Sequence, residues 1–319
     1  MTADKGRREI RQGVFDPRSS IIIPNFGRDL TSLIVDGIDI THEINEISNV
    51  GDDTRLISPY KPVLQLEQLA AVEGVGLYDR GFALGGEEVI EIKYGPTGLE
   101  SLLKIFKSRS IALENSTKNG KLRQFFASAT YSQGKLVGRH LVSERIAPAI
   151  DYAIQKSSAY YDYKKRCMFC DIRRQEQNTM VNEESRVIFL DKYNNGYLGF
   201  VPFDPPQEYY LTILPLKHVL RLKELSDEEI KNLAFRIYQS IEILNYATKG
   251  QRVDVFLYST PLSHPKAENL EKSHHFYVRA VPEGTQNEIR GTGWYVVTKR
   301  PKDVAGELRG FLEQLFSNH

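Results

Sequence analysis

The sequence predicts an α+β fold, in which helices pack to one side of an antiparallel sheet. Two observations support this fold class: the order of the elements in the second half of the chain, and the short turns that join them. From about residue 187 onward the order is three strands, a helix, three strands and a closing helix. Strands joined by turns pair antiparallel, because parallel neighbours need a long crossover connection.

The strands of the second half are short runs of β-branched and aromatic residues separated by Asn, Gly and Pro, a pattern typical of strands. They are expected at 187–190, 196–203, 209–214, 253–258, 275–281 and 294–298.

The helix between the two groups of strands has a clear start and a clear end. Ser226 and Glu229 match a capping box, and Lys249-Gly250 supplies the stop. Apolar residues recur between them at helical spacing, at Ile230, Leu233, Ala234, Ile237, Ile241 and Leu244. A closing helix is expected at about 301–316, so each group of three strands is followed by one helix.

The strand at 275–281 alternates between polar and apolar residues. One face carries His275, Tyr277, Arg279 and Val281, and the other carries Phe276, Val278 and Ala280. A Tyr hydroxyl and an Arg guanidinium beside a histidine are suited to a phosphate-binding cleft. The alternative is that Tyr277 and Arg279 only face solvent.

The first half is less regular. Strands are expected at 20–24, 88–94 and 122–129, and a helix at 99–106. Residues 35–69 fit neither the helical nor the strand period. Residues 151–165, with four tyrosines, read as the connection into the second half. We therefore place two domains at 1–150 and 151–319, in line with the length prior for 319 residues.

A basic, glycine-containing loop is expected near the end of the first half. Lys121, Arg123, Lys135 and Arg139 bring four cations into a short span. Such a loop could hold an anionic substrate, although a lone basic loop is more often solvated surface.

The bulk composition is that of an ordinary soluble protein. The 42 Lys and Arg nearly balance the 41 Asp and Glu, which gives a net charge of +1. This balance indicates no broad cationic surface for nucleic acid. The sequence has no apolar run of membrane-spanning length and no signal peptide at its start. We expect a cytoplasmic protein with no membrane or nucleic-acid partner.

The two cysteines of the chain, Cys167 and Cys170, stand three residues apart. This spacing lets both thiolates reach one metal ion, and zinc needs about two further ligands, usually imidazoles. His218 and His275 lie downstream in β-like surroundings. The pair could instead be two reduced core thiols. A redox pair is the weaker competitor, because it would open a helix beside a βαβ unit, whereas Cys170 leads into a charged run.

Five segments of the second half carry a family resemblance. They are residues 167–170, 214–225, 258–261, 275–282 and 291–295. In order and spacing they resemble the carboxy-terminal half of galactose-1-phosphate uridylyltransferases and of the related ADP-glucose phosphorylases, within the histidine-triad superfamily. The resemblance covers about 166–316 and implies two histidine-triad-like half-domains, antiparallel sheets with helices packed on them. The first half resembles the family only faintly, so its half-domain is degenerate.

The resemblance implies a zinc site with four protein ligands: Cys167, Cys170, His218 and His275. His274 or His264 could replace His275 as the fourth ligand, because neighbouring imidazoles are chemically equivalent. A shell closed by four protein ligands makes the ion structural, since catalytic zinc keeps one position open.

The chemistry of the family lies in a His-x-His-x-Gln motif of the first half, whose second histidine attacks the α-phosphorus of a nucleotide sugar. On this resemblance His140 takes the position of the nucleophile, while Gly138 replaces the first histidine and Val142 the glutamine. The resemblance also implies substrate-binding residues, namely Arg28, Lys135, Arg139, Gly291, Thr292 and Gly293.

Two functional hypotheses follow. The first is a nucleotidyltransferase or phosphorylase that acts on a nucleotide sugar, or a related nucleotide, and on a sugar 1-phosphate or phosphate, through a covalent nucleotidyl-histidine. The alternative is a catalytically inactive nucleotide-binding or scaffold protein that keeps only the structural zinc. A hydrolase that uses Tyr277 or His274 is a weaker third hypothesis, because tyrosine is a poor nucleophile unless activated. A homodimer is expected from the resemblance.

Overall fold

The computed structural model describes only part of the chain. The described residues are 34–35, 38–39, 54–64, 85–116, 124–143, 146, 148–179, 185–193, 195–203, 205, 207–261, 267–283 and 297–317. The predicted strand at 20–24 lies outside them, as do Arg28, His264 and Gly291 to Gly293.

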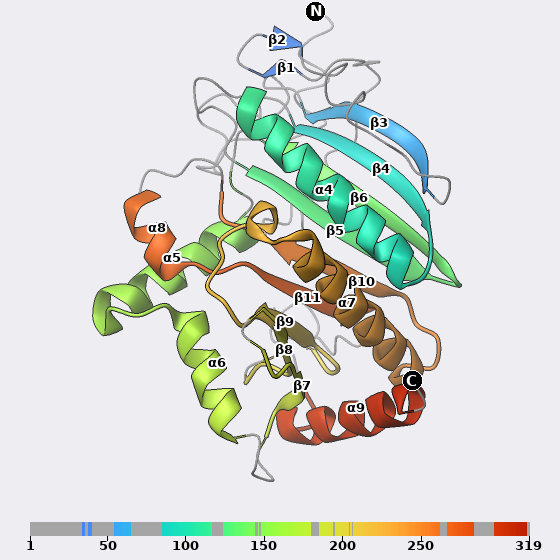
Figure 1. The fold of residues 1–319 in the computed structure, drawn as a ribbon, viewed down its shortest axis with the longest axis vertical. Helices are drawn as coiled ribbons and strands as arrows, with labels where there is room; N and C mark the ends of the chain where they lie inside the picture. Colours follow the sequence, from blue (N-terminus) through green and yellow to red (C-terminus); the bar gives the residue numbers. More distant parts are fainter. Residues whose placement is uncertain are drawn as a thin grey trace, which may run out of the picture.

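One antiparallel sheet of nine strands forms the centre of the described chain (Figure 1). Its strands, in spatial order, are β3 (Thr54–Leu64), β4 (Gly85–Lys93), β6 (Lys135–Ser143), β5 (Gln124–Ser132), β10 (Val253–Tyr258), β11 (Tyr277–Pro282), β9 (Leu211–Pro215), β8 (Tyr197–Phe200) and β7 (Val187–Leu190). Two further short strands, β1 (Ile34–Val35) and β2 (Ile38–Asp39), pair with each other. The predicted α+β class with an antiparallel sheet is therefore confirmed.

The two halves of the chain meet within this sheet. Strand β5 of the first half pairs with β10 of the second, with Val255 opposite Ala129. The Thr130 hydroxyl donates a hydrogen bond to Asp254 across this seam, at 2.7 Å. The predicted domain boundary near residue 150 thus separates strands that share one sheet, and the division into two domains at 1–150 and 151–319 stays a prediction.

Three helices cover one face of the sheet: α4 (Pro96–Ser116), α7 (Asp227–Ala247) and α9 (Pro301–Phe316). Figure 1 shows α4 and α7 crossing this face side by side. The main apolar core lies beneath them and includes Phe106, Ile213 and Val278. The predicted capping box at Ser226 and the predicted apolar stripe of α7 are both confirmed, because every residue of the stripe is buried.

The other helices are α5 (Pro148–Lys164), α6 (Met168–Thr179), α8 (Ala267–Ser273) and the short 3-10 helix η1 (Leu222–Glu224). A second apolar cluster joins Phe169 of α6 to Leu198, Leu214 and Tyr277. The residues next to Leu198, Leu214 and Tyr277 along their strands point into the main core. This second cluster therefore lies on the opposite face of the sheet. The expectation that helices pack to one side only is wrong, because α6 buries this second face.

Three segments differ from their predictions in the residues that the structure describes. Of the expected basic loop, Lys121 and Arg123 lie outside the described residues, whereas Lys135 and Arg139 belong to strand β6. This strand is joined to β5 by a two-residue turn in which Gln133 and Gly134 have φ of 50° and 79°. Positive φ at both positions is the geometry of a tight hairpin, so no open loop forms there. The connection expected at 151–165 is helix α5. Of the strand expected at 294–298, only 297–298 are described, and they are not in a strand. Among the described residues, no helix combines the length and apolar character needed to cross a membrane.

Candidate metal centre

Three separate segments supply the side chains of the candidate metal centre. Cys167 directly precedes α6 and Cys170 lies in its first turn, where the Asp171 N–H donates to the Cys167 carbonyl at 3.1 Å. Residues three apart share one face of a helix, so both sulfur atoms point the same way. His218 follows β9, and His275 lies two residues before β11. The fold therefore brings together side chains that are about 50 to 110 residues apart in sequence.

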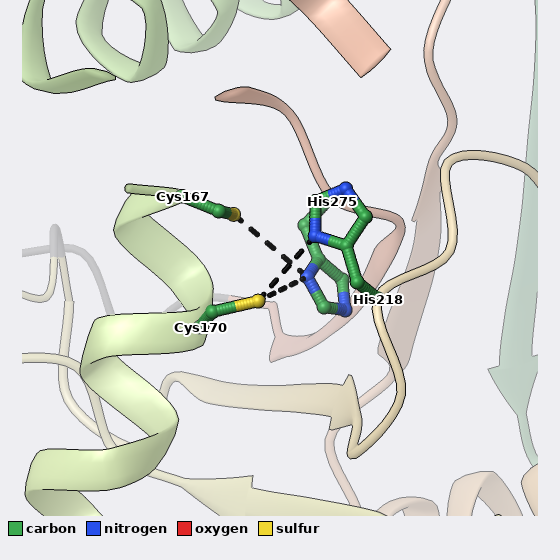
Figure 2. Close-up of side chains that lie close together, drawn as sticks. All are labelled: Cys167, Cys170, His218 and His275. Atoms are coloured by element: carbon green, nitrogen blue, oxygen red, sulfur yellow. Dashed lines mark hydrogen bonds between the residues drawn. The ribbon is translucent and has the colours of Figure 1, made fainter. Parts of the chain in front are cut away.

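The four ligand atoms converge closely. All of them lie within 4.8 Å of one another. The Cys170 sulfur lies 3.4 Å from Nδ1 of His218 and 3.7 Å from Nδ1 of His275, and the Cys167 sulfur lies 4.0 Å from the same His275 atom. Figure 2 shows both sulfur atoms turned toward the two imidazole rings.

These distances fit a tetrahedral ion. With zinc–sulfur bonds of about 2.3 Å and zinc–nitrogen bonds of about 2.0–2.1 Å, adjacent sulfur and nitrogen ligands stand about 3.6 Å apart. The observed separations of 3.4, 3.7 and 4.0 Å bracket that value. The four side chains can therefore hold one metal ion and complete its coordination shell without a water molecule.

A backbone contact fixes the orientation of one imidazole. Nε2 of His218 lies 2.9 Å from the carbonyl oxygen of Glu271 and donates its proton there, which leaves Nδ1 unprotonated toward Cys170. The hydrogen bond with Cys170 raises the pKa of His218 above its ordinary value. His275 is fully buried, and its burial lowers its pKa. In its neutral form, His218 therefore turns the lone pair of Nδ1 toward Cys170.

The two thiols are electrostatically different. The hydrogen bond from Cys167, followed by those from the two histidines, lowers the pKa of Cys170, whereas the same bond and burial raise the pKa of Cys167. The cysteine pair does open a helix, contrary to the sequence expectation, and a helix N-terminus favours a thiolate. The βαβ unit expected of a redox pair is absent from the described sheet, since every pairing in it is antiparallel.

The structure distinguishes between the candidate fourth ligands. His275, rather than His274, turns Nδ1 toward the sulfur atoms. His274 is fully buried beside Phe169, with ring centroids 6.3 Å apart, and burial lowers its pKa to about 3. His264 lies outside the described residues.

His140 lies in a very different place. It is fully buried on β6, with the rings of Phe106 and Phe125 each 5.6 Å away. Burial lowers its pKa to about 3. Phe106 belongs to α4, so the imidazole points into the helix-covered face of the sheet. The preceding residue, Arg139, is exposed and lies on the opposite face of the sheet.

Of the other residues predicted for substrate binding, Lys135 and Arg139 are described, and neither lies beside His140. Lys135 is exposed at the end of the β5–β6 hairpin, and Arg139 lies across the sheet from the imidazole. At Gly138, where the resemblance replaces a histidine, an added Cβ would lie 2.3 Å from Leu102 Cδ1. Lys135, Gly138 and Arg139 therefore supply no metal ligand beside His140.

Sequence reasoning missed two residues near the centre. Tyr210 and Tyr258 surround Arg279 together with Tyr277, whose ring stacks on that of Phe169 at 4.7 Å. Strand alternation could have paired Tyr258 with Tyr277, but nothing in the sequence places the strands beside each other.

Comparisons with known proteins support the fold. An ADP-glucose phosphorylase from Arabidopsis thaliana, solved with bound ADP-glucose, matches with a TM-score of 0.64 and 15% identity, over 81% of this chain and 80% of that one. A uridylyltransferase matches with a TM-score of 0.64 and 18% identity, over 83% of this chain and 86% of that one. A GalT-like protein from the same plant gives 0.59 and 15%, over 70% and 75%.

No family model matches the sequence, and no curated protein matches it. At these identities the structural matches establish a shared fold. They confirm, at the level of the fold, the resemblance stated from the sequence.

Proposed function

We propose that this protein binds a nucleotide or nucleotide sugar, and that one structural zinc ion holds its second half together. The convergence of Cys167, Cys170, His218 and His275 carries the proposal. The non-catalytic hypothesis is favoured over covalent transfer, because the candidate nucleophile is buried away from solvent.

Zinc is the metal that suits this ligand set best. Two thiolates with two imidazoles in tetrahedral spacing favour zinc over magnesium or calcium, which prefer oxygen ligands. When bound, the ion supplies structural cross-linking, because four protein ligands leave no open position. The ligands tie the start of α6 to the segments after β9 and before β11.

The nucleotide part of the proposal is supported by the shared fold. One matching structure contains ADP-glucose, and another is a uridylyltransferase. A nucleotide sugar is therefore the first ligand class to test. A sugar 1-phosphate or phosphate acceptor belongs only to the covalent-transfer hypothesis, whereas the homodimer is part of the present proposal. Both depend on the fold likeness alone.

Covalent transfer through His140 has a specific obstacle. A histidine nucleophile needs an accessible nitrogen lone pair and donors aimed at the phosphoryl oxygens. His140 is fully buried, and the exposed Arg139 lies on the other face of the sheet. A reaction at this imidazole would need the strand or α4 to move before the substrate could reach it.

Two measurements test the proposal. Metal analysis of the purified protein should find about one zinc ion per chain, and a metal-free native protein would contradict the structural site. A thermal-shift panel of nucleotides and nucleotide sugars should contain at least one stabilising ligand, worth about 2.7 kcal/mol at a hundredfold excess over its dissociation constant. A panel without any stabilising compound would contradict nucleotide binding.

A separate assay decides between the two hypotheses. The protein is incubated with a nucleotide sugar labelled at the α-phosphorus, denatured at alkaline pH and analysed for bound label. We expect no label on either the wild type or His140→Gln. An acid-labile label on the wild type that disappears in His140→Gln would establish covalent catalysis and refute the non-catalytic hypothesis.

A further inference from the structure

Arg279 lies among three tyrosine rings on the face of the sheet opposite α7. Its guanidinium carbon is 4.7 Å from the ring centroid of Tyr258, 5.1 Å from that of Tyr277 and 5.3 Å from that of Tyr210. The side chain is half-buried, and its neighbours Tyr277 and Tyr210 are 0% and 6% exposed. The charge therefore lies at the edge of an aromatic cluster with partial access to solvent.

In the described part of the chain no carboxylate pairs with Arg279. Asp254, two residues from its cross-strand neighbour Phe256, is instead engaged by Arg252 at 2.9 Å and by Thr130 at 2.7 Å. Glu283, the residue that follows β11, also forms an ion pair with Arg252, at 3.7 Å. The acidic groups nearest to Arg279 along these strands are thus already engaged with another cation.

The guanidinium keeps hydrogen-bonding capacity to spare. Its Nε atom is buried and has no hydrogen-bond partner among the described residues. The Tyr258 hydroxyl accepts one hydrogen bond from the guanidinium. The aromatic rings stabilise the cation through their quadrupole, but they offer no lone pairs to its remaining N–H groups. A partly desolvated cation without a counter-ion is unfavourable, so an anion at this position would stabilise the folded protein.

Hydroxyl groups add further donors. Tyr258 and Tyr277 are cross-strand partners whose rings stack at 4.6 Å with only 8° between their planes, so both project from the same face. The Tyr277 hydroxyl is buried and has no partner among the described residues. The two hydroxyls and the edge of the guanidinium can donate hydrogen bonds from different directions. They therefore suit an acceptor group that has several oxygen atoms. A phosphoryl group offers three, whereas the two oxygens of a carboxylate share one plane.

We propose that Arg279, with the hydroxyls of Tyr258 and Tyr277, binds a phosphoryl group on this face of the second half. That the group belongs to a nucleotide rests on the proposed function, whereas the anion site itself does not. Phe169, which stacks on Tyr277, stands between the two cysteines in sequence. The metal centre therefore positions one wall of the phosphoryl site.

Inorganic pyrophosphate is the probe, and the wild type is compared with Arg279→Met and Arg252→Met. Arg252→Met is the matched control, because it removes the same charge from an adjacent strand end, where Arg252 is paired with Asp254. Pyrophosphate should raise the melting temperature of the wild type and of Arg252→Met, whereas Arg279→Met should bind it at least about tenfold more weakly. Equal affinity in all three proteins would overturn the site.

The same variants test whether Arg279 has a purely structural role. Without pyrophosphate, Arg279→Met should be as stable as the wild type or more stable, because methionine fills the space without an unpaired charge. At saturating pyrophosphate the order should reverse. An equal loss of stability with and without the anion would assign Arg279 to packing. Arg279→Lys keeps the positive charge but not the planar guanidinium group. Its affinity for pyrophosphate should lie between those of the wild type and Arg279→Met.

The outcomes for the two proposals can be separated. If pyrophosphate binds in an Arg279-dependent manner and no nucleotide binds, the phosphoryl site stands and the proposed function fails. If a nucleotide binds wild type and Arg279→Met equally, nucleotide binding stands and the phosphoryl site fails.

Discussion

Each half of the molecule contains a fully buried histidine, but the surroundings of the two imidazole rings differ. His140 in the first half and His275 in the second are both 0% exposed, and burial lowers the pKa of each. The neighbours of His140 include two phenylalanine rings at 5.6 Å. Those of His275 include two cysteine sulfurs, at 3.7 and 4.0 Å, and a second imidazole.

Burial and a shifted pKa therefore do not by themselves distinguish a functional histidine from a core residue. What distinguishes them is whether other donor atoms converge on the same point. In the second half, a helix start and two loops bring donors together at His275. In the first half, the strand turns the imidazole under α4, whereas its charged neighbour Arg139 faces the other way.

The largest effect is expected from the metal centre. Cys170→Ser should lose the ion and lower the free energy of unfolding by on the order of 5 kcal/mol, because loss of a structural metal is among the most destabilising single changes. Metal analysis together with chemical denaturation measures both consequences. Glu271→Gln is the control: its backbone carbonyl, not its side chain, holds His218, so metal and stability should be retained. Full stability of metal-free Cys170→Ser would remove the contrast between the halves.

The next effect concerns His140 and pH. Its folded-state pKa of about 3 lies below the ordinary value of 6.5, so the unfolded chain takes up the proton first as the pH falls. The stabilisation due to the neutral ring is complete above about pH 6.5 and is lost toward pH 3, by up to about 1.4 kcal/mol per pH unit. From pH 7 to pH 4 the wild type should lose about 3 kcal/mol more than His140→Leu.

Denaturation curves of both proteins across this pH range provide the measurement. The difference between them cancels the contribution of other groups, including the buried His274. A difference that does not change with pH would mean that His140 is accessible and titrates normally. That result would restore it as a candidate nucleophile.

A smaller effect is expected at Gly138. The added methyl group of Gly138→Ala would lie 2.3 Å from Leu102 of α4, so overpacking should cost about 2 kcal/mol. Gly310→Ala in α9 is the control, because its Cβ meets nothing within 4 Å and alanine favours the helix by up to about 1 kcal/mol. Thermal unfolding of both variants should give shifts of opposite sign. A neutral Gly138→Ala would show that this face of the first half has room for a ligand.

The smallest effect concerns the contact between the halves. The Tyr94 hydroxyl donates a hydrogen bond to Glu242 of α7 at 2.6 Å, so Tyr94→Phe should cost about 1 kcal/mol. Tyr238→Phe, whose ring lies 5.4 Å from Tyr94, is the control and should change stability less. In both variants, fluorescence and circular dichroism should report one common unfolding transition. Two separate transitions would mean that the halves unfold independently.

The sequence was sufficient for the features that depend on local pattern. The capping box and apolar stripe of α7, the strands at 187–190 and 253–258, and the closing helix all follow from periodicity and end signals. The four candidate metal ligands could also be selected from the sequence, because few cysteines and histidines are present and the cysteine spacing restricts their geometry.

Only the tertiary structure decided which face each strand buries. A period of two separates His140 from Arg139, but it does not say which of the two lies under a helix, because that depends on where α4 packs. The choice of His275 over His274, and the meeting of Arg279 with Tyr210 and Tyr258, have the same origin. Contacts between strands that are distant in sequence are set by pairing register across the sheet, which no single segment encodes.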